Sequence, residues 1–161
     1  MSQTLENDFH HRIDLFEPGD KTALVCVDVP EVQRIAVENL SELGYKIHTG
    51  LFAEDILLKL QSHLYDVVVI SEHFNASTLT TNPILQFLND IPQGQRRRQF
   101  MLLVGSSVHT DSDMEAWANS VDLVVSLADV PNLKHVLRRA VQRNRAFYVP
   151  YIEALETAGQ A

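Results

Sequence analysis

Short polar stretches follow the apolar segments of the chain, and they contain the residues best suited to chemistry. These residues are Asp28 after the run at 22–27, Ser71, Glu72 and His73 after 66–70, Gly105, Ser106, Ser107 and His109 after 100–104, and Ser126 and Leu127 after 123–125. A single carboxylate such as Asp28 suits a hard cation or a helix cap. A nucleotide site would instead need a loop rich in Gly, Ser or Thr after the first run. The pattern therefore argues against a phosphate-cradling loop at that point.

Two kinds of reactive site could be assembled from these residues. Asp28, Glu72, His73 and His109 are metal-ligand types, but their spacing is not diagnostic and loop histidines are usually solvated. Ser71 with His73 or His109 could form a nucleophile and base, but the sharp G-x-S-x-G turn is missing. We therefore expect no bound metal, no cofactor and no catalytic residue. Asp28 is then expected to cap the helix that begins at Pro30.

Apolar runs alternate with segments of helical periodicity along the chain. Strands are predicted at 22–27, 46–49, 66–70, 100–104 and 123–125, and helices at 30–43, 53–64, 83–88, 113–119 and 130–148. Uninterrupted apolar strands are typical of a parallel sheet that is buried on both faces. The prediction is a flavodoxin-like (CheY-like) α/β sandwich of three layers, with a five-stranded parallel sheet in the order 2-1-3-4-5. Ligands of this fold lie at the carboxyl ends of the strands.

The ends of the chain are expected to differ from the middle. We predict a leader at 1–20, a compact domain at 21–148 and a helical tail at 149–161. Residues 12–16 (RIDLF) could form an extra edge strand, followed by a turn at Pro18-Gly19. Pro150 is expected to separate the helix at 130–148 from a short final helix at 151–158. The apolar residues of this tail could pack on the domain or on a neighbouring copy.

Length and composition set broad limits on function. The chain has 161 residues, of which 45% are hydrophobic and 21% charged, so one globular domain is expected. The net charge of −8 disfavours general nucleic-acid binding. One cysteine, Cys26, excludes an intrachain disulfide and is expected to pack as a small core residue. Without an apolar run of membrane-spanning length, the expected location is the cytoplasm.

Several stretches carry a resemblance to a known family. They are Leu24 to Arg34 (LVCVDVPEVQR), Leu43-Gly44-Tyr45, Tyr65-Asp66 before an apolar strand, and Val121-Asp122 before the last strand. Together, over about residues 20–145, they resemble the receiver domain of bacterial two-component response regulators. The resemblance implies an acidic pair that binds magnesium, an aspartate that accepts phosphate, and a hydroxyl residue and a lysine that contact the phosphate.

The positions that match this machinery carry other residues. The acidic pair falls on Asp28 and Val29, and the phosphoacceptor falls on Ser71, or on Glu72 if the register slips by one residue. The remaining matches are the hydroxyl position at Gly105 or Ser106, the lysine at Leu127, and the aromatic switch position at Val124. Acyl phosphate chemistry needs a carboxylate nucleophile, a divalent ion and a cation at the developing charge. The sequence therefore predicts a degenerate receiver, or pseudo-receiver, that lacks the usual aspartyl phosphorylation.

The same resemblance implies a protein-binding face on the fourth predicted helix, the fifth strand and the fifth helix. The candidate interface residues are Trp117, Val124, Lys134, Arg138 and Arg139. A second basic cluster lies at 96–98. Basic residues on an acidic chain suit an acidic protein partner better than nucleic acid, because aromatic interleaving and a recognition helix are missing.

The expected function is a non-catalytic signalling domain that acts through protein contacts, with a homodimer as the expected assembly. An alternative is a small-molecule sensor whose cleft is lined by Ser71, Gly105, Ser106 and Leu127. The two hypotheses differ in whether a ligand stabilises the fold.

Overall fold

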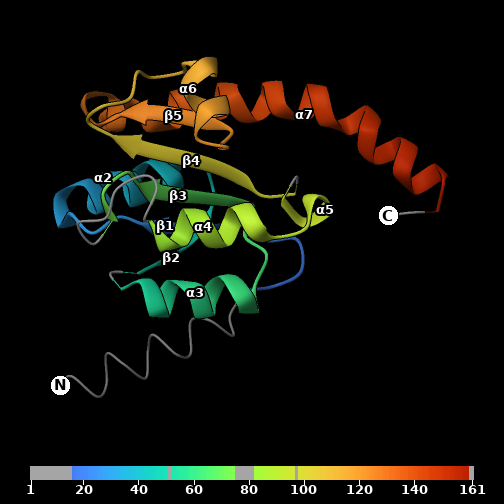
Figure 1. The fold of residues 1–161 in the computed structure, drawn as a ribbon, viewed down its shortest axis with the longest axis horizontal. Helices are drawn as coiled ribbons and strands as arrows, with labels where there is room; N and C mark the ends of the chain where they lie inside the picture. Colours follow the sequence, from blue (N-terminus) through green and yellow to red (C-terminus); the bar gives the residue numbers. More distant parts are fainter. Residues whose placement is uncertain (1–15, 51, 75–81, 97, 160–161) are drawn as a thin grey trace.

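The computed structural model describes residues 16–50, 52–74, 82–96 and 98–159 (Figure 1). Its elements in chain order are β1 (Thr22–Cys26), α2 (Pro30–Glu42), β2 (Lys46–Thr49), α3 (Ala53–Ser62), β3 (Val67–Ser71), α4 (Pro83–Asp90), α5 (Gln93–Arg96), β4 (Phe100–Gly105), α6 (Asp113–Ala118), β5 (Leu123–Ser126), the 3-10 helix η2 (Leu127–Asn132) and α7 (Leu133–Thr157).

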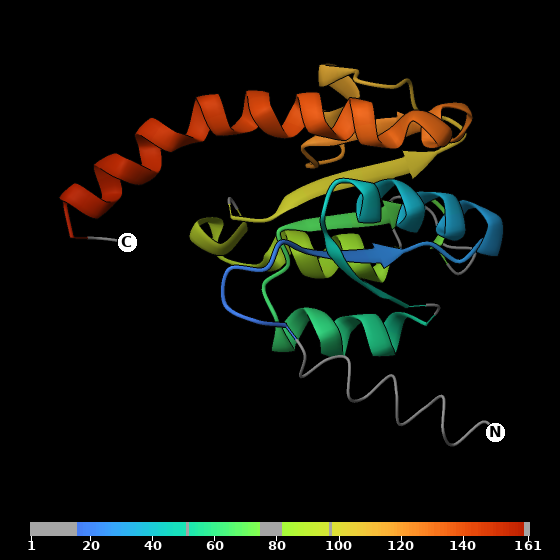
Figure 2. The same cartoon turned by 180° about the vertical axis from the view of Figure 1, so that it is seen from behind.

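Within the described residues, the strands form one parallel sheet in the order β2-β1-β3-β4-β5, which confirms the predicted topology. Helices cover both faces of the sheet (Figures 1 and 2). Alternate strand residues enter two separate cores because successive side chains point to opposite faces. Leu24 and Ile70 pack with α3 and α4, and Val25 and Val69 pack with α2 and α7.

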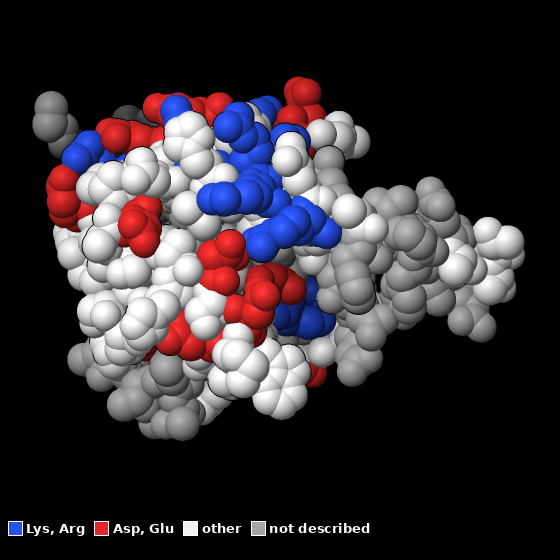
Figure 3. Space-filling view, turned by 90° about the horizontal axis from the view of Figure 1, so that it is seen from above, with Lys and Arg blue, Asp and Glu red and all other residues white. Residues whose placement is uncertain are grey.

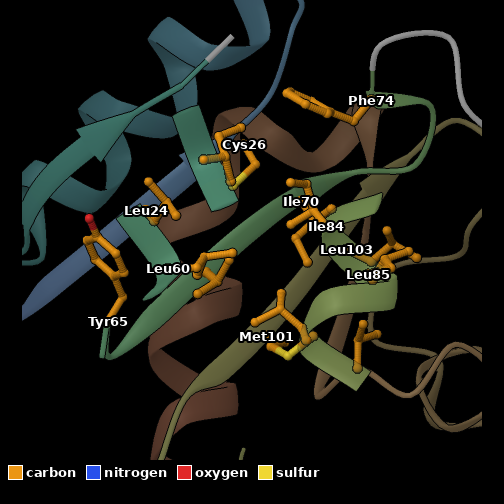
Figure 4. Close-up of a cluster of buried hydrophobic side chains, with 14 of the residues drawn as sticks. Leu24, Cys26, Leu60, Tyr65, Ile70, Phe74, Ile84, Leu85, Met101 and Leu103 are labelled. Atoms are coloured by element: carbon orange, nitrogen blue, oxygen red, sulfur yellow. The ribbon is translucent and has the colours of Figure 1, made fainter. Parts of the chain in front are cut away.

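Figure 4 shows the core beneath α3 and α4, whose members converge from both helices and the sheet. Tyr65 and Phe74 are its bulkiest fully buried residues. Cys26 lies in this core, as expected, and is fully buried. Continuous burial of β1, β3 and β4 explains why these strands read as uninterrupted apolar runs.

Aspartates placed just before two strands tie neighbouring strands together. Asp66 Oδ2 accepts a hydrogen bond of 2.8 Å from Thr22 N, and Asp122 Oδ2 accepts one of 2.8 Å from Met101 N. Each carboxylate thus satisfies a backbone N–H at the beginning of the adjacent strand. This is a structural reason for the Tyr65-Asp66 and Val121-Asp122 patterns.

The predicted break at Pro150 is wrong, because α7 continues without interruption from Leu133 to Thr157. Proline removes one hydrogen bond within a helix and crowds the preceding turn, so it can bend a helix without ending it. The helix changes direction in its C-terminal half, where it extends past the sheet (Figure 1). The predicted edge strand at 12–16 lies outside the described residues except for Phe16, which is in irregular structure.

The connector at 91–99 also contains a helix that the sequence analysis did not predict. The short α5 occupies Gln93–Arg96. Arg96 then turns towards the body, where its guanidinium donates to Asp122 Oδ2 (3.1 Å) and to the carbonyl oxygen of Ser120 (2.7 Å). This arginine therefore stabilises the fold, although the sequence placed it in an exposed basic cluster.

Candidate functional site

Glu72 is the central residue at the carboxyl end of the sheet. It directly follows β3, is only 3% exposed, and its backbone N–H donates to Val104 O at 2.8 Å. Ser107 donates to its carboxylate through the hydroxyl and, at 3.4 Å, through the backbone N–H. His73 Nε2 lies 3.0 Å from Glu72 Oε1. The buried carboxylate is thus held by donors from the ends of β3 and β4, as a buried charge requires.

Gly105, the last residue of β4, makes room for this carboxylate. A Cβ atom at Gly105 would lie 1.9 Å from Glu72 Oε2 and 2.8 Å from Glu72 Cδ. Such distances are far below van der Waals contact, so any larger residue must displace Glu72. The sequence matched Gly105 to a phosphate-binding hydroxyl, whereas the structure uses it to accommodate an acidic side chain.

The other candidate residues stand at separate strand ends. Ser71 is the last residue of β3, and its carbonyl oxygen accepts from Asn82 Nδ2 at 3.0 Å. Asp28 is half-buried after β1, Ser106 is exposed after β4, and Leu127 is 41% exposed as the first residue of η2. The predicted helix cap at Asp28 is wrong, because Val29 occupies the N-cap of α2 and forms no side-chain cap hydrogen bond.

A further network beside the site was missed by the sequence analysis. Thr110 donates through its hydroxyl to the carboxylate of Asp129, and the same hydroxyl accepts from Ser126 N at 2.9 Å. These contacts join the loop after β4 to the end of β5 and to η2. Single threonine and aspartate residues in loops gave no signal for this pairing, because 19 positions separate them in the chain.

The two loop histidines are paired with different carboxylates. His73 contacts Glu72, and His109 Nδ1 lies 2.7 Å from Glu115 Oε1 on α6. Among the described residues, no group of three or more His, Cys, Asp or Glu side chains is placed to hold a metal ion. The alternative site of Asp28, Glu72, His73 and His109 is therefore not assembled here.

The arrangement at the strand ends is anionic and hydrogen-bonded. The Glu72 carboxylate is already engaged by Ser107 and His73. Leu127, which the resemblance matches to the phosphate-binding lysine, is apolar.

The face formed by α6, β5 and α7 exposes two large apolar side chains. Trp117 is 82% exposed and Met114 is 77% exposed, one helical turn apart on α6. A hollow of about 320 Å³ lies beside Trp117, with Ala116, Val121 and Ala140 in its lining. Val124, predicted for this interface, is fully buried and belongs to the core under α3 and α4. It is therefore wrong as a surface residue, because its side chain is buried in the core together with Ala116 of α6.

Charged residues on this face form both internal pairs and an open patch. Lys134 Nζ lies 2.6 Å from Glu42 Oε2, and Arg143 Nη2 lies 2.6 Å from Asp111 Oδ1. Arg138 and Arg139 are exposed and contact no carboxylate within the described part of the chain. Figure 3 shows basic side chains gathered beside an acidic group on this side of the molecule. Both signs of charge are thus available within one surface.

No helix in the described part of the chain is long and apolar enough to cross a membrane. No protein-family profile matches the sequence, and no curated protein sequence matches it either.

Solved structures share the fold at low sequence identity. The chemotaxis response regulator CheY4 of Vibrio cholerae is 17% identical with a TM-score of 0.58, and the match covers 78% of this chain and 98% of that one. HP1043, an orphan response regulator of H. pylori, is 14% identical with a TM-score of 0.57 over 77% of this chain and 98% of that one. NtrX from Brucella abortus, solved with ADP, is 13% identical with a TM-score of 0.64, and the match covers 88% of this chain but 30% of NtrX. The described part of this chain therefore has the fold of response regulator receiver domains.

Proposed function

We propose that this chain is a signalling domain of receiver fold that is not phosphorylated on an aspartate and acts through protein contacts. The observation that carries this proposal is the environment of Glu72. Its buried carboxylate lies over Gly105 and is already bonded to Ser107 and His73. The last residue of β3 is Ser71, whose hydroxyl is a weak nucleophile without an activating base.

Magnesium-dependent phosphorylation tests this part of the proposal. The protein is incubated with acetyl phosphate and magnesium, and its intact mass is measured before and after. We expect no mass change, because the acceptor carboxylate and the phosphate-binding lysine are both replaced. The variant Ser71→Asp with Leu127→Lys restores those two groups and serves as the matched comparison. A stoichiometric, magnesium-dependent gain of one phosphoryl group by the unmodified chain would refute the proposal.

The contact surface in this proposal is the α6–β5–α7 face, and the partner is a second copy of the chain. In a two-fold dimer the same surface patch of both copies forms the interface, so the patch must contain residues that bind one another, such as opposite charges. The exposed Trp117 lines a hollow together with Asp113, and the exposed Met114 lies one helical turn from Trp117. Arg138 and Arg139 are exposed on α7. Exposed aromatic and arginine side chains are typical anchors of interfaces.

Light scattering across a range of protein concentrations tests the dimer. We expect Trp117→Ala and Arg139→Glu to shift the protein towards monomer while leaving its unfolding midpoint nearly unchanged, because both side chains are exposed. Phe52→Ala is the matched control, since Phe52 is 70% exposed but lies at the N-cap of α3, outside this face. A purely monomeric parent protein, or an equal effect of Phe52→Ala, would contradict the proposed surface.

A further inference from the structure

The hollow between α6 and α7 has an acidic and an aromatic residue on the same side. Asp113 and Trp117 are four positions apart on α6, so their side chains project from one side of that helix, and both line the hollow. Ala140 and Arg143 of α7 line it as well. The hollow is therefore bordered by a carboxylate and an indole from one helix and by α7 from the other.

A carboxylate beside an exposed indole suits a guanidinium group. A flat guanidinium can stack on the face of tryptophan, the aromatic ring that attracts cations most strongly. It can also donate two parallel hydrogen bonds to a carboxylate. Trp117 is 82% exposed, and Asp113 forms no ion pair within the described part of the chain. Arg143 already lies 2.6 Å from Asp111 Oδ1, so the hollow can take a second guanidinium.

Arg139 is an exposed arginine of this face that contacts no carboxylate among the described residues. It precedes Arg143 by four positions on α7, so both project from the same side of the helix. Like charges at this spacing repel each other, and Asp111 neutralises only Arg143. Arg138 belongs to the other side of α7, because Lys134, four positions before it, pairs with Glu42 of α2 at 2.6 Å.

We propose that Arg139 of one copy binds the Asp113–Trp117 pair of a second copy, with its guanidinium stacked on the indole and bonded to the carboxylate. This inference rests on the proposed dimer and specifies which residues meet in it. A second copy is the favoured partner because the arginine and the acidic pair are both unused and lie on one face of the same chain. In a two-fold dimer the contact occurs twice, so each copy provides one arginine and receives one.

Charge reversal in separate copies tests this reciprocal contact. Asp113→Arg alone sets two arginines against each other in the dimer, and Arg139→Asp alone sets two aspartates against each other. Each variant is therefore expected to raise the dimer dissociation constant about tenfold or more. An equal mixture of the two variants restores opposite charges at both contacts, one between native residues and one between introduced residues. We expect light scattering to show dimers in the mixture at concentrations where each variant alone is monomeric.

Arg138→Asp is the matched control, because Arg138 is exposed and adjacent in sequence but projects from the other side of α7. It is expected to form its own dimer with the parent's affinity and not to recruit the Asp113→Arg copy. Native mass spectrometry identifies each pair by its mass, and circular dichroism checks that every variant is folded. A dimeric parent whose two charge-reversed variants do not pair with each other would overturn this contact and leave the proposed dimer standing. A parent that is monomeric at every concentration would refute both.

Trp117 gives a second readout, since it is the one tryptophan of the chain. An indole covered by a guanidinium is less accessible to acrylamide, a fluorescence quencher. We expect quenching of the parent to fall as its concentration rises through the dimerisation range, and quenching of Arg139→Asp to stay high over the same range. Dimerisation of the parent without any change in quenching would overturn the proposed contact and place the dimer interface on another face.

Discussion

The Glu72 carboxylate lies directly over the Cα position of Gly105, so that a single added methyl group would come within 1.9 Å of Glu72 Oε2. This relationship joins the ends of β3 and β4 and fixes what the carboxyl edge of the sheet can hold. The Glu72 carboxylate can be buried here only because the neighbouring strand β4 carries a glycine, without a side chain, at position 105.

Gly105→Ala is therefore expected to destabilise the protein by about 1–3 kcal/mol, as overpacking of a filled site does. The measurement is the free energy of unfolding in urea. Gly94→Ala is the control, because a Cβ at Gly94 meets no atom within 4 Å. The cost of Gly105→Ala should shrink when Glu72→Ala is also present, since the clashing side chain is then removed. Additive effects of the two substitutions would contradict a direct clash.

Asp122→Ala is expected to lower the free energy of unfolding by about 1–3 kcal/mol, because it leaves the backbone N–H of Met101 without its acceptor. It also frees the Arg96 guanidinium from its 3.1 Å contact. Thermal or urea unfolding measures the loss. Asp90→Ala, at an exposed carboxylate that ends α4, should change stability by less than about 0.5 kcal/mol. If both variants lose the same stability, the bridging role of Asp122 is not supported.

Stability should fall as the pH is lowered through the range in which histidine titrates. Burial lowers the pKa of His63 from its ordinary value of 6.5, although the nearby Asp66 carboxylate opposes this shift. The unfolded chain then takes up a proton more readily than the folded chain, so the contribution is complete above pH 6.5 and is lost as the pH falls towards the folded pKa.

Urea titrations of the parent protein and of His63→Gln at several pH values between 7.5 and 5 check this expectation. The variant should lose less stability over that range. His135→Gln, at an exposed position on α7, should keep the parent's pH dependence. A parent curve that matches the His63→Gln curve would show that His63 does not contribute.

Cys26 should resist thiol reagents in the folded protein. It is fully buried, and burial raises the pKa of its thiol well above neutral pH, so little reactive thiolate is available. Labelling by a thiol-reactive dye is expected to be slow at neutral pH and to become rapid in denaturant. Rapid labelling without denaturant would indicate local opening between β1 and α3.

Local sequence patterns were sufficient to predict the five strands and the topology of the sheet. Strands that are buried on both faces must be apolar throughout, so β1, β3 and β4 were recognisable without neighbours. Both ends of α2 were also predictable from local signals. Proline at Pro30 begins the helix, and Gly44, just after its C-terminus, has a φ of 90°, which glycine adopts readily. The loss of the acceptor and lysine residues at Ser71 and Leu127 could likewise be proposed from residue identity.

The contacts between residues at the strand ends depend on how distant segments pack together. Glu72 meets Ser107 across 35 positions, and this contact follows from the β3–β4 register, which pairs Ser71 with Val104. The burial of Val124, the exposure of Trp117 and the passage of α7 through Pro150 also depend on packing between distant segments. Local sequence patterns set which segments become strands and helices, but they do not set the distances between side chains that come together only when the sheet forms.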